Sequence, residues 1–336
     1  MSGMKWETFI GWDDSETAGV LDNPYYFGVQ SFDLPPAIER NLAEQATGTR
    51  SYHRSVIVRK DLSGSINYEA DAETLTRLLS WGIGAGVATP MGIGDQTSWS
   101  FKPKHTSPVL TPFYIREYKA LTGETNGLIY GPSKFNSITL EATAGEKLMA
   151  SGEFFVSHPA VAAAGVHGAE TFPDLELKPF MFDQLVFLED DHAAFPPSTG
   201  VLVERFSMTL NNNLVTDRRV AQAANSQYPY NLPEGKVGIT GEMDIQFDNA
   251  DTYQDFIAGQ EKMVRATFTG DLMTGGTNNY LLQIDIPRLV LDTHNRGGAI
   301  EGGNDRLVAT IGFTAMYDST EATELEATLQ NLTTAI

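Results

Sequence analysis

The densest group of side chains able to bind a metal ion is Glu189-Asp190-Asp191-His192. Carboxylates are the ligands that hard cations such as Ca²⁺ prefer. The four residues are consecutive, however, and neighbouring residues of a strand point to opposite faces, so these side chains do not converge on one ion. We therefore interpret residues 189–192 as a solvated acidic turn, and the sequence predicts no metal site.

Catalytic and cofactor motifs are nearly absent from the chain. There is no Gly-x-Ser-x-Gly elbow and no His-Glu-x-x-His helix. Residues 270–277 have phosphate-loop glycine spacing but lack the lysine, and residues 82–86 follow a helix, the wrong order for a dinucleotide site. The sequence predicts no cofactor and no catalysis. Two alternatives stay open: a β-sandwich glycosidase, whose carboxylates would be recognised only by their separation in space, and a carbohydrate-binding or adhesin protein.

One structural unit occurs twice at an offset of 177 residues. Residues 63–82 show strand alternation through Tyr68, then Asp71 as a helix N-cap, a helical leucine pattern, and Gly82 as a left-handed helix end. Residues 241–259 repeat this order, with Asp248 as the cap and Gly259 as the stop. The sequence therefore predicts a strand, a cap and a short helix in each half.

A second echo relates residues 146–154 to residues 305–313, at an offset of 159. Two ordered echoes indicate tandem duplication of one fold. We predict a first module over residues 1–160, with an N-terminal arm, and a second over residues 161–336. Residues 157–174 are the candidate linker. The remaining pattern of many short strands predicts a mainly β protein, with two antiparallel β-sandwich or barrel modules and one short flanking helix in each. The tail from Asp318 fits either a helix or an edge strand, and its threonine content favours the strand.

The composition excludes several other classes of protein. The chain of 336 residues has no cysteine, 43 acidic and 23 basic residues, and a net charge of −20. Such acidity disfavours tight binding of nucleic-acid phosphates. No apolar run is long enough to cross a bilayer, so no membrane insertion is expected.

Three segments resemble the tail tube (major tail) proteins of long-tailed bacteriophages, in the form with two tube modules per chain. They are residues 10–17 (Ile-Gly-Trp-Asp-Asp-Ser-Glu-Thr), 62–66 (Leu-Ser-Gly-Ser-Ile) and 203–212 (Val-Glu-Arg-Phe-Ser-Met-Thr-Leu-Asn-Asn). The resemblance implies a structural virion protein, made in the host cytoplasm, whose trimeric rings with near six-fold symmetry stack into a tube that conducts DNA at genome ejection. It also implies the tape measure protein, the tail terminator and the tail tip or baseplate as partners.

Two groups of residues are candidates for these roles. The long excursions at residues 41–55 and 214–235 are too long and polar for simple hairpin loops, and we expect them to contact other rings or subunits. Their candidate contact residues are Arg50, Arg54, Arg218, Arg219, Tyr228 and Tyr230. Glu69, Glu242 and Asp244 occupy alternate polar strand positions and are the candidate carboxylates of an acidic channel wall that DNA passes without specific binding.

Overall fold

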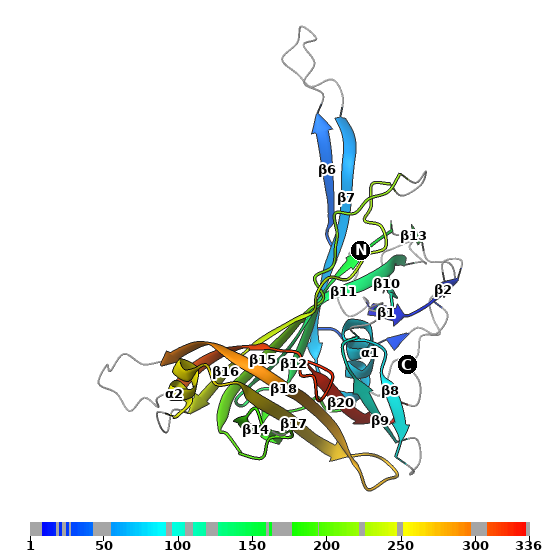
Figure 1. The fold of residues 1–336 in the computed structure, drawn as a ribbon. Coiled ribbons are helices and arrows are strands. Elements are labelled where there is room, and N and C mark those ends of the chain that lie inside the picture. The colour runs from blue at the N-terminus through cyan, green and yellow to red at the C-terminus, as the bar shows by residue number, and fades with distance from the viewer. Residues whose placement is uncertain are drawn as a thin grey trace.

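The computed structural model describes residues 9–17, 20–21, 25–26, 28–42, 55–91, 96–104, 110–118, 127–158, 161–162, 177–193, 195–221, 226–246, 251–296 and 308–333. In these ranges the chain is mainly β, as predicted, with one α-helix in each half (Figure 1). The elements are β1 (Phe9–Asp13), β2 (Glu16–Thr17), β3 (Val20–Leu21), β4 (Tyr25–Tyr26), β5 (Ser31–Asp33), β6 (Pro36–Leu42), β7 (Ser55–Glu69), α1 (Ala72–Gly82), β8 (Val87–Pro90), β9 (Thr97–Phe101), β10 (Phe113–Tyr118), β11 (Leu128–Thr143), β12 (Met149–Val156), β13 (Val161–Ala162), η2 (Phe182–Gln184), β14 (Leu185–Asp191), β15 (Val203–Asn211), β16 (Gly238–Gln246), α2 (Asp251–Ala258), β17 (Lys262–Leu272), β18 (Asn279–Arg296), β19 (Val308–Ala315) and β20 (Glu326–Asn331).

Seven antiparallel strands form an inner sheet that runs through both halves. Their order is β7–β12–β11–β15–β16–β19–β18, and β5 and β6 border β7. The halves meet where β11 pairs with β15, from Ser137 opposite Asn211 to Thr143 opposite Arg205. We call this pairing the seam. The last inner strand of the first half is thereby joined directly to the first inner strand of the second.

The strand registers place the repeated sequence positions in equivalent surroundings in the two halves. Gly64 lies opposite Phe154 in β7–β12, and Gly241 lies opposite Phe313 in β16–β19. In both places the phenylalanine ring fills the space that a glycine Cβ would occupy. The offsets of 177 and 159 read from the sequence therefore relate residues in the same structural position.

Two further correspondences emerge only from the pairing. The β-bulge after Phe135 in β11 recurs after Leu291 in β18, at an offset of 156. Phe32 lies opposite Ile66, and the equivalent of Ile66, Met243, lies opposite Phe206. The strand β5 and its extension into β6 thus correspond to β15, which the sequence pattern alone did not reveal.

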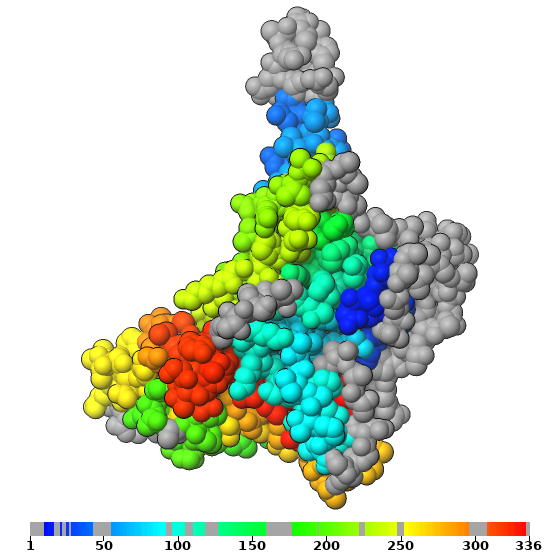
Figure 2. Space-filling model, turned by 45° about the vertical axis from the view of Figure 1, so that its right-hand side comes forward, coloured from blue at the N-terminus to red at the C-terminus, as the bar shows by residue number. Residues whose placement is uncertain are grey.

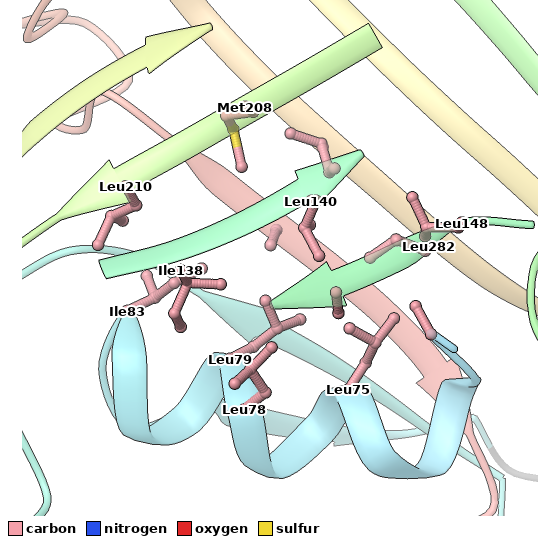
Figure 3. Packing of buried hydrophobic residues seen from close by; sticks show 14 of the residues in the cluster. Leu75, Leu78, Leu79, Ile83, Ile138, Leu140, Leu148, Met208, Leu210 and Leu282 are labelled. Atoms are coloured by element: carbon pink, nitrogen blue, oxygen red, sulfur yellow. The ribbon is translucent and has the colours of Figure 1, made fainter. Parts of the chain in front are cut away.

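Helix α1 fills the core beneath the inner sheet. The Asp71 carboxylate accepts hydrogen bonds from the Glu73 and Thr74 amides, both at 2.9 Å, which confirms the predicted N-cap. The predicted helix face is buried among side chains of β11, β15 and β18 (Figure 3). The residues shown there include Leu75, Leu78, Leu79, Ile83, Ile138, Leu140, Leu148, Met208, Leu210 and Leu282. Burial of this stripe, rather than helix propensity, therefore stabilises α1.

The predicted left-handed end of α1 at Gly82 is wrong. Gly82 is the last helical residue, and Ile83 follows it in a right-handed conformation with φ of −97°. A Cβ at Gly82 would overlap the Ile138 side chain, so the glycine permits close packing of α1 on β11. The matching prediction for the second half is correct, because Gly259 has φ of +66°.

The outer layer covers α1 and mixes segments from both halves. The first part of β18 pairs with β17 on one side and β20 on the other, and the second edge of β20 pairs with β9. The C-terminal segment is therefore a strand, as favoured, but it lies between two neighbours rather than at an edge. The predicted linker at residues 157–174 and the module boundary at 160/161 fall mostly outside the described residues.

Candidate functional site

The polar face of the inner sheet carries all three predicted channel carboxylates. Met243 and Ile245 of β16 are buried, so Glu242 and Asp244 point to the opposite side. Tyr68 of β7 is buried as well, which places Glu69 on that same side. We call this side the polar face. Alternation along each strand therefore brings residues from both halves to one surface.

Strand register aligns these side chains in rows across the sheet. Glu69 lies opposite Met149, which lies opposite Glu141 of β11. Glu141 lies opposite Ser207, which in turn lies opposite Glu242. One row thus contains three glutamates on three strands. The row beside it contains short neutral side chains: Asn67, Ser151, Thr139, Thr209, Thr240 and Thr314.

Arg205 is the basic side chain that β15 contributes to this face. Its Nη2 lies 2.8 Å from the Glu141 carboxylate and its Nη1 lies 3.4 Å from Glu242, so it links β11 to β16 across the seam. The hydrogen bond to Glu141 is the main cause that raises the pKa of Arg205. At the edge of the face, the Lys147 ammonium bonds Glu69 at 2.6 Å and lowers the pKa of that carboxyl. No sequence pattern indicated either pairing in advance.

Strands β6 and β7 extend beyond the body as a two-stranded hairpin, which we call the arm (Figure 1). Of the predicted excursion at residues 41–55, the described residues Asn41, Leu42 and Ser55 belong to these two strands, with Asn41 opposite Val56. Ile38, Val56 and Val58 are each about half exposed on the arm. The candidates Arg50 and Arg54 lie outside the described residues.

The second excursion lies against the base of the arm in the same chain. We call its described residues, 214–221 and 226–235, the strap; its atoms cover the base of the arm (Figure 2). Arg219 pairs with Asp61 of β7, and the Tyr228 ring lies under the Lys60 ammonium, 5.5 Å from it. Arg218 is exposed, and its carbonyl accepts a hydrogen bond from the Tyr230 amide at 2.8 Å. The structure thus brings Arg219 and Tyr228 to the arm but leaves the Arg218 side chain at the surface.

The acidic segment at residues 189–192 is not the solvated turn we predicted. It ends strand β14, whose pairing with β17 places Lys262 opposite Asp191. The Lys262 ammonium lies 2.6 Å from Asp191, 2.5 Å from Asp255 and 3.8 Å from the buried Glu189. In the described part of the chain, no group of three or more acidic, histidine or cysteine side chains is arranged to hold a metal ion.

A hollow of about 530 Å³ contains carboxylates and bears on the glycosidase alternative. Asp71 and Glu73 line it together with Glu69. Asp71 caps α1, and Glu73 accepts the Leu332 amide at 3.0 Å, so both hold the helix and the C-terminal strand in place. Burial raises the pKa of both carboxyls. These contacts account for the two carboxylates by structure alone, without a sugar ligand.

A family model described as phage tail tube protein matches residues 5–315. The search of curated proteins found no match. None of the helices described here has the length and apolar composition needed to cross a bilayer.

Proposed function

The chain belongs to the phage tail tube protein family, whose members are structural components of the virion tail, and from this premise we propose that three copies close into a ring. Each chain supplies two equivalent halves, so the ring has six tube modules and near six-fold symmetry. Rings then stack into a hollow tube. The protein acts by its shape and charge rather than by catalysis.

The observation that carries this proposal is the seam. Within the chain, the last inner strand of one half pairs with the first inner strand of the other, β11 with β15. The equivalent strands at the two ends of the chain, β18 and β5 with its extension into β6, each have an edge without a described partner. A head-to-tail contact between these edges repeats the seam and closes a ring when the rotation matches.

The offsets between the halves give the register of this contact. Ser137 of the seam corresponds to Thr293 in β18, because both follow the same bulge. Asn211 corresponds to Ala37, because their partners Gly238 and Asp61 are 177 residues apart. We therefore expect Thr293 of one copy to lie opposite Ala37 of the next.

The polar face is our candidate for the channel wall. Its row of Glu69, Glu141 and Glu242 would form an acidic ring in the closed assembly. Like charge keeps double-stranded DNA from being held as it passes, with the residual field screened over about 8 Å at physiological salt. The tape measure protein would occupy the same channel before ejection, and the tail terminator and the tail tip or baseplate would bind the two ends of the tube.

Cross-linking tests the ring. The natural chain has no cysteine, so the double variant Thr293→Cys, Ala37→Cys carries one reactive pair per subunit contact. With a short dimaleimide, we expect covalent species up to a trimer and none larger. The control, Thr293→Cys with Ile38→Cys, moves one thiol to the opposite face and should react poorly. A ladder that continues past three chains, or efficient reaction of the control, would contradict the register or the ring.

Binding of DNA tests the channel charge. Purified tubes should bind double-stranded DNA weakly even at low salt, because an acidic wall releases no phosphate counterions. The measurement is electrophoretic mobility of short duplexes over a range of ionic strength. Tight binding that strengthens as salt falls would show a basic bore and refute an acidic wall.

A further inference from the structure

We propose that the strap is a splint, built into the same chain, that fixes the direction of the arm before the arm meets another copy. Arg219, Gln227 and Tyr228 are then positioning residues. The consequence for assembly rests on the proposed tube function, whereas the splint itself is a property of the single chain.

The arm has little in its own structure to fix its direction. A two-stranded hairpin is marginally stable in water without a third strand or a packed face. The side chains of Ile38, Val56 and Val58 on the arm are about half exposed rather than packed on the body. Beyond its base, β7 has lost the pairing with β12, which begins at Leu62.

The strap supplies the missing neighbour along the free edge of β7. The Lys60 amide donates to the Gln227 carbonyl at 2.9 Å, and Gln227 Nε2 donates to the Ile57 carbonyl at 3.0 Å. These two bonds satisfy backbone groups of β7 on the side opposite β6. The strap thus acts as a short third strand at the base of the arm.

An ion pair also holds the strap against the arm, close to these two hydrogen bonds. The Arg219 guanidinium pairs with Asp61, which also receives Arg59 of the arm. Arg219 further donates to the carbonyls of Asp217, at 3.2 Å, and Gln227, at 3.3 Å. One planar guanidinium therefore ties both limbs of the strap to β7, a geometry that a lysine reproduces only in part.

The foot of the strap is anchored in the body, as a splint requires. Leu214 and Leu232 are buried with Leu110 in a small apolar cluster. The Lys134 ammonium bonds the Glu234 carboxylate at 2.7 Å, and both side chains are only about one-tenth exposed. Because the foot is fixed, contacts at the upper end of the strap transmit the orientation of the body to the arm.

The charge of the arm indicates what it meets. Residues 36–61 hold five basic and three acidic residues, a net charge of +2 in a chain of −20. A second copy of this acidic chain is therefore an electrostatically favourable partner. A pre-directed arm loses less conformational entropy on docking than a swinging one, so the splint should speed assembly.

Spin labelling tests the splint in the single chain. Cysteines at Val58 on the arm and Val186 on β14 are both exposed positions and are the sole thiols. We expect a narrow distance distribution between the two labels, a broad one with Arg219→Ala, and an intermediate one with Arg219→Lys. Arg218→Ala is the matched control, because the neighbouring Arg218 carries the same charge but its side chain is exposed. An unchanged distribution in Arg219→Ala would overturn the splint.

Light scattering and electron microscopy of the unlabelled variants test its consequence. Loss of a hydrogen bond between charged groups corresponds to about a tenfold change in population, so tube formation should slow about tenfold in Arg219→Ala and stay unchanged in Arg218→Ala. Equal rates in both variants, despite a broadened distribution, would refute the role in assembly. Failure of the natural chain itself to form tubes would refute the proposed function while the label distances still decide the splint.

Discussion

The arm and the strap occupy the same place in the two halves of the molecule. Ala37 lies opposite Asp61 in the first half, and their equivalents Asn211 and Gly238 lie opposite each other in the second. Residues 38–60 and 212–237 are therefore two versions of one connection. The arm continues the sheet beyond the body as a hairpin. The strap, in its described residues, forms no strand and lies against the arm.

Local sequence explains why the two connections differ. The arm contains Val56, Ile57 and Val58, β-branched residues that favour extended pairing. The strap contains Pro229 and Pro233, which remove ladder donors, while Asn213, Asn231 and Leu232 adopt positive φ. The two halves thus share the pairing of the inner sheet but differ in this connection, and the strap of the second half contacts the projecting arm of the first.

Among these tests, removing the strap should have the largest effect, which is a loss of tube formation. Replacing residues 219–229 with two glycines is feasible, because the Tyr230 amide already bonds the Arg218 carbonyl at 2.8 Å. We expect unchanged strand content by circular dichroism and loss of long tubes by electron microscopy. A Gly/Ser segment of the original length is the control for length and should fail to restore tubes. Tubes of normal length in the shortened variant would show that the strap is dispensable.

Breaking the foot of the strap should be the next largest effect. Lys134→Ala leaves the Glu234 carboxylate buried without its ammonium partner, and such losses cost about 3 kcal/mol of unfolding free energy. Urea unfolding measures the change. Lys178→Ala removes an exposed ion pair with Asp271 and should leave the transition unchanged. Similar behaviour of the two variants would mean that the foot is not an anchor.

Matched glycine substitutions should destabilise the two halves by equal amounts. Gly64→Ala and Gly241→Ala each push a Cβ against the facing ring, Phe154 or Phe313. We expect each to cost about 1–3 kcal/mol by overpacking, and the two values to agree closely. Thermal and urea unfolding would measure them. Tolerance at one glycine and severe loss at the other would mean that the shared register does not imply shared packing.

The smallest expected effect concerns Arg205, an ion-pairing residue that the seam has and that the proposed contact between chains does not. Arg205 links Glu141 and Glu242 across the seam, whereas the equivalent residue of the first half is Ser31. Because these side chains are partly exposed, Arg205→Ala should cost about 0.5 kcal/mol at low salt and less at high salt. Ser31→Ala should change little at either ionic strength. A salt-independent loss would assign Arg205 a packing role instead of an electrostatic one.

The sequence alone determined the features that depend on neighbouring residues. Alternation predicted the inner strands, and Asp71 predicted the start of α1, because pleat period and capping act over a few residues. Two ordered echoes predicted the duplication, and the resemblance of three segments predicted the family that the comparison shows. The same alternation placed Glu69, Glu242 and Asp244 on polar strand positions.

Only the tertiary structure decided which distant residues meet. Arg219 and Asp61 are 158 residues apart, and their pairing depends on how two equivalent connections fold toward each other. The sequence pattern predicted that Gly82 ends the helix in a left-handed conformation, but the glycine instead permits close packing of α1 against Ile138. The row of glutamates and the Arg205 bridge likewise follow from register across the seam. Local patterns carry no information about such contacts, because long-range packing and strand order select the partners after the elements have formed.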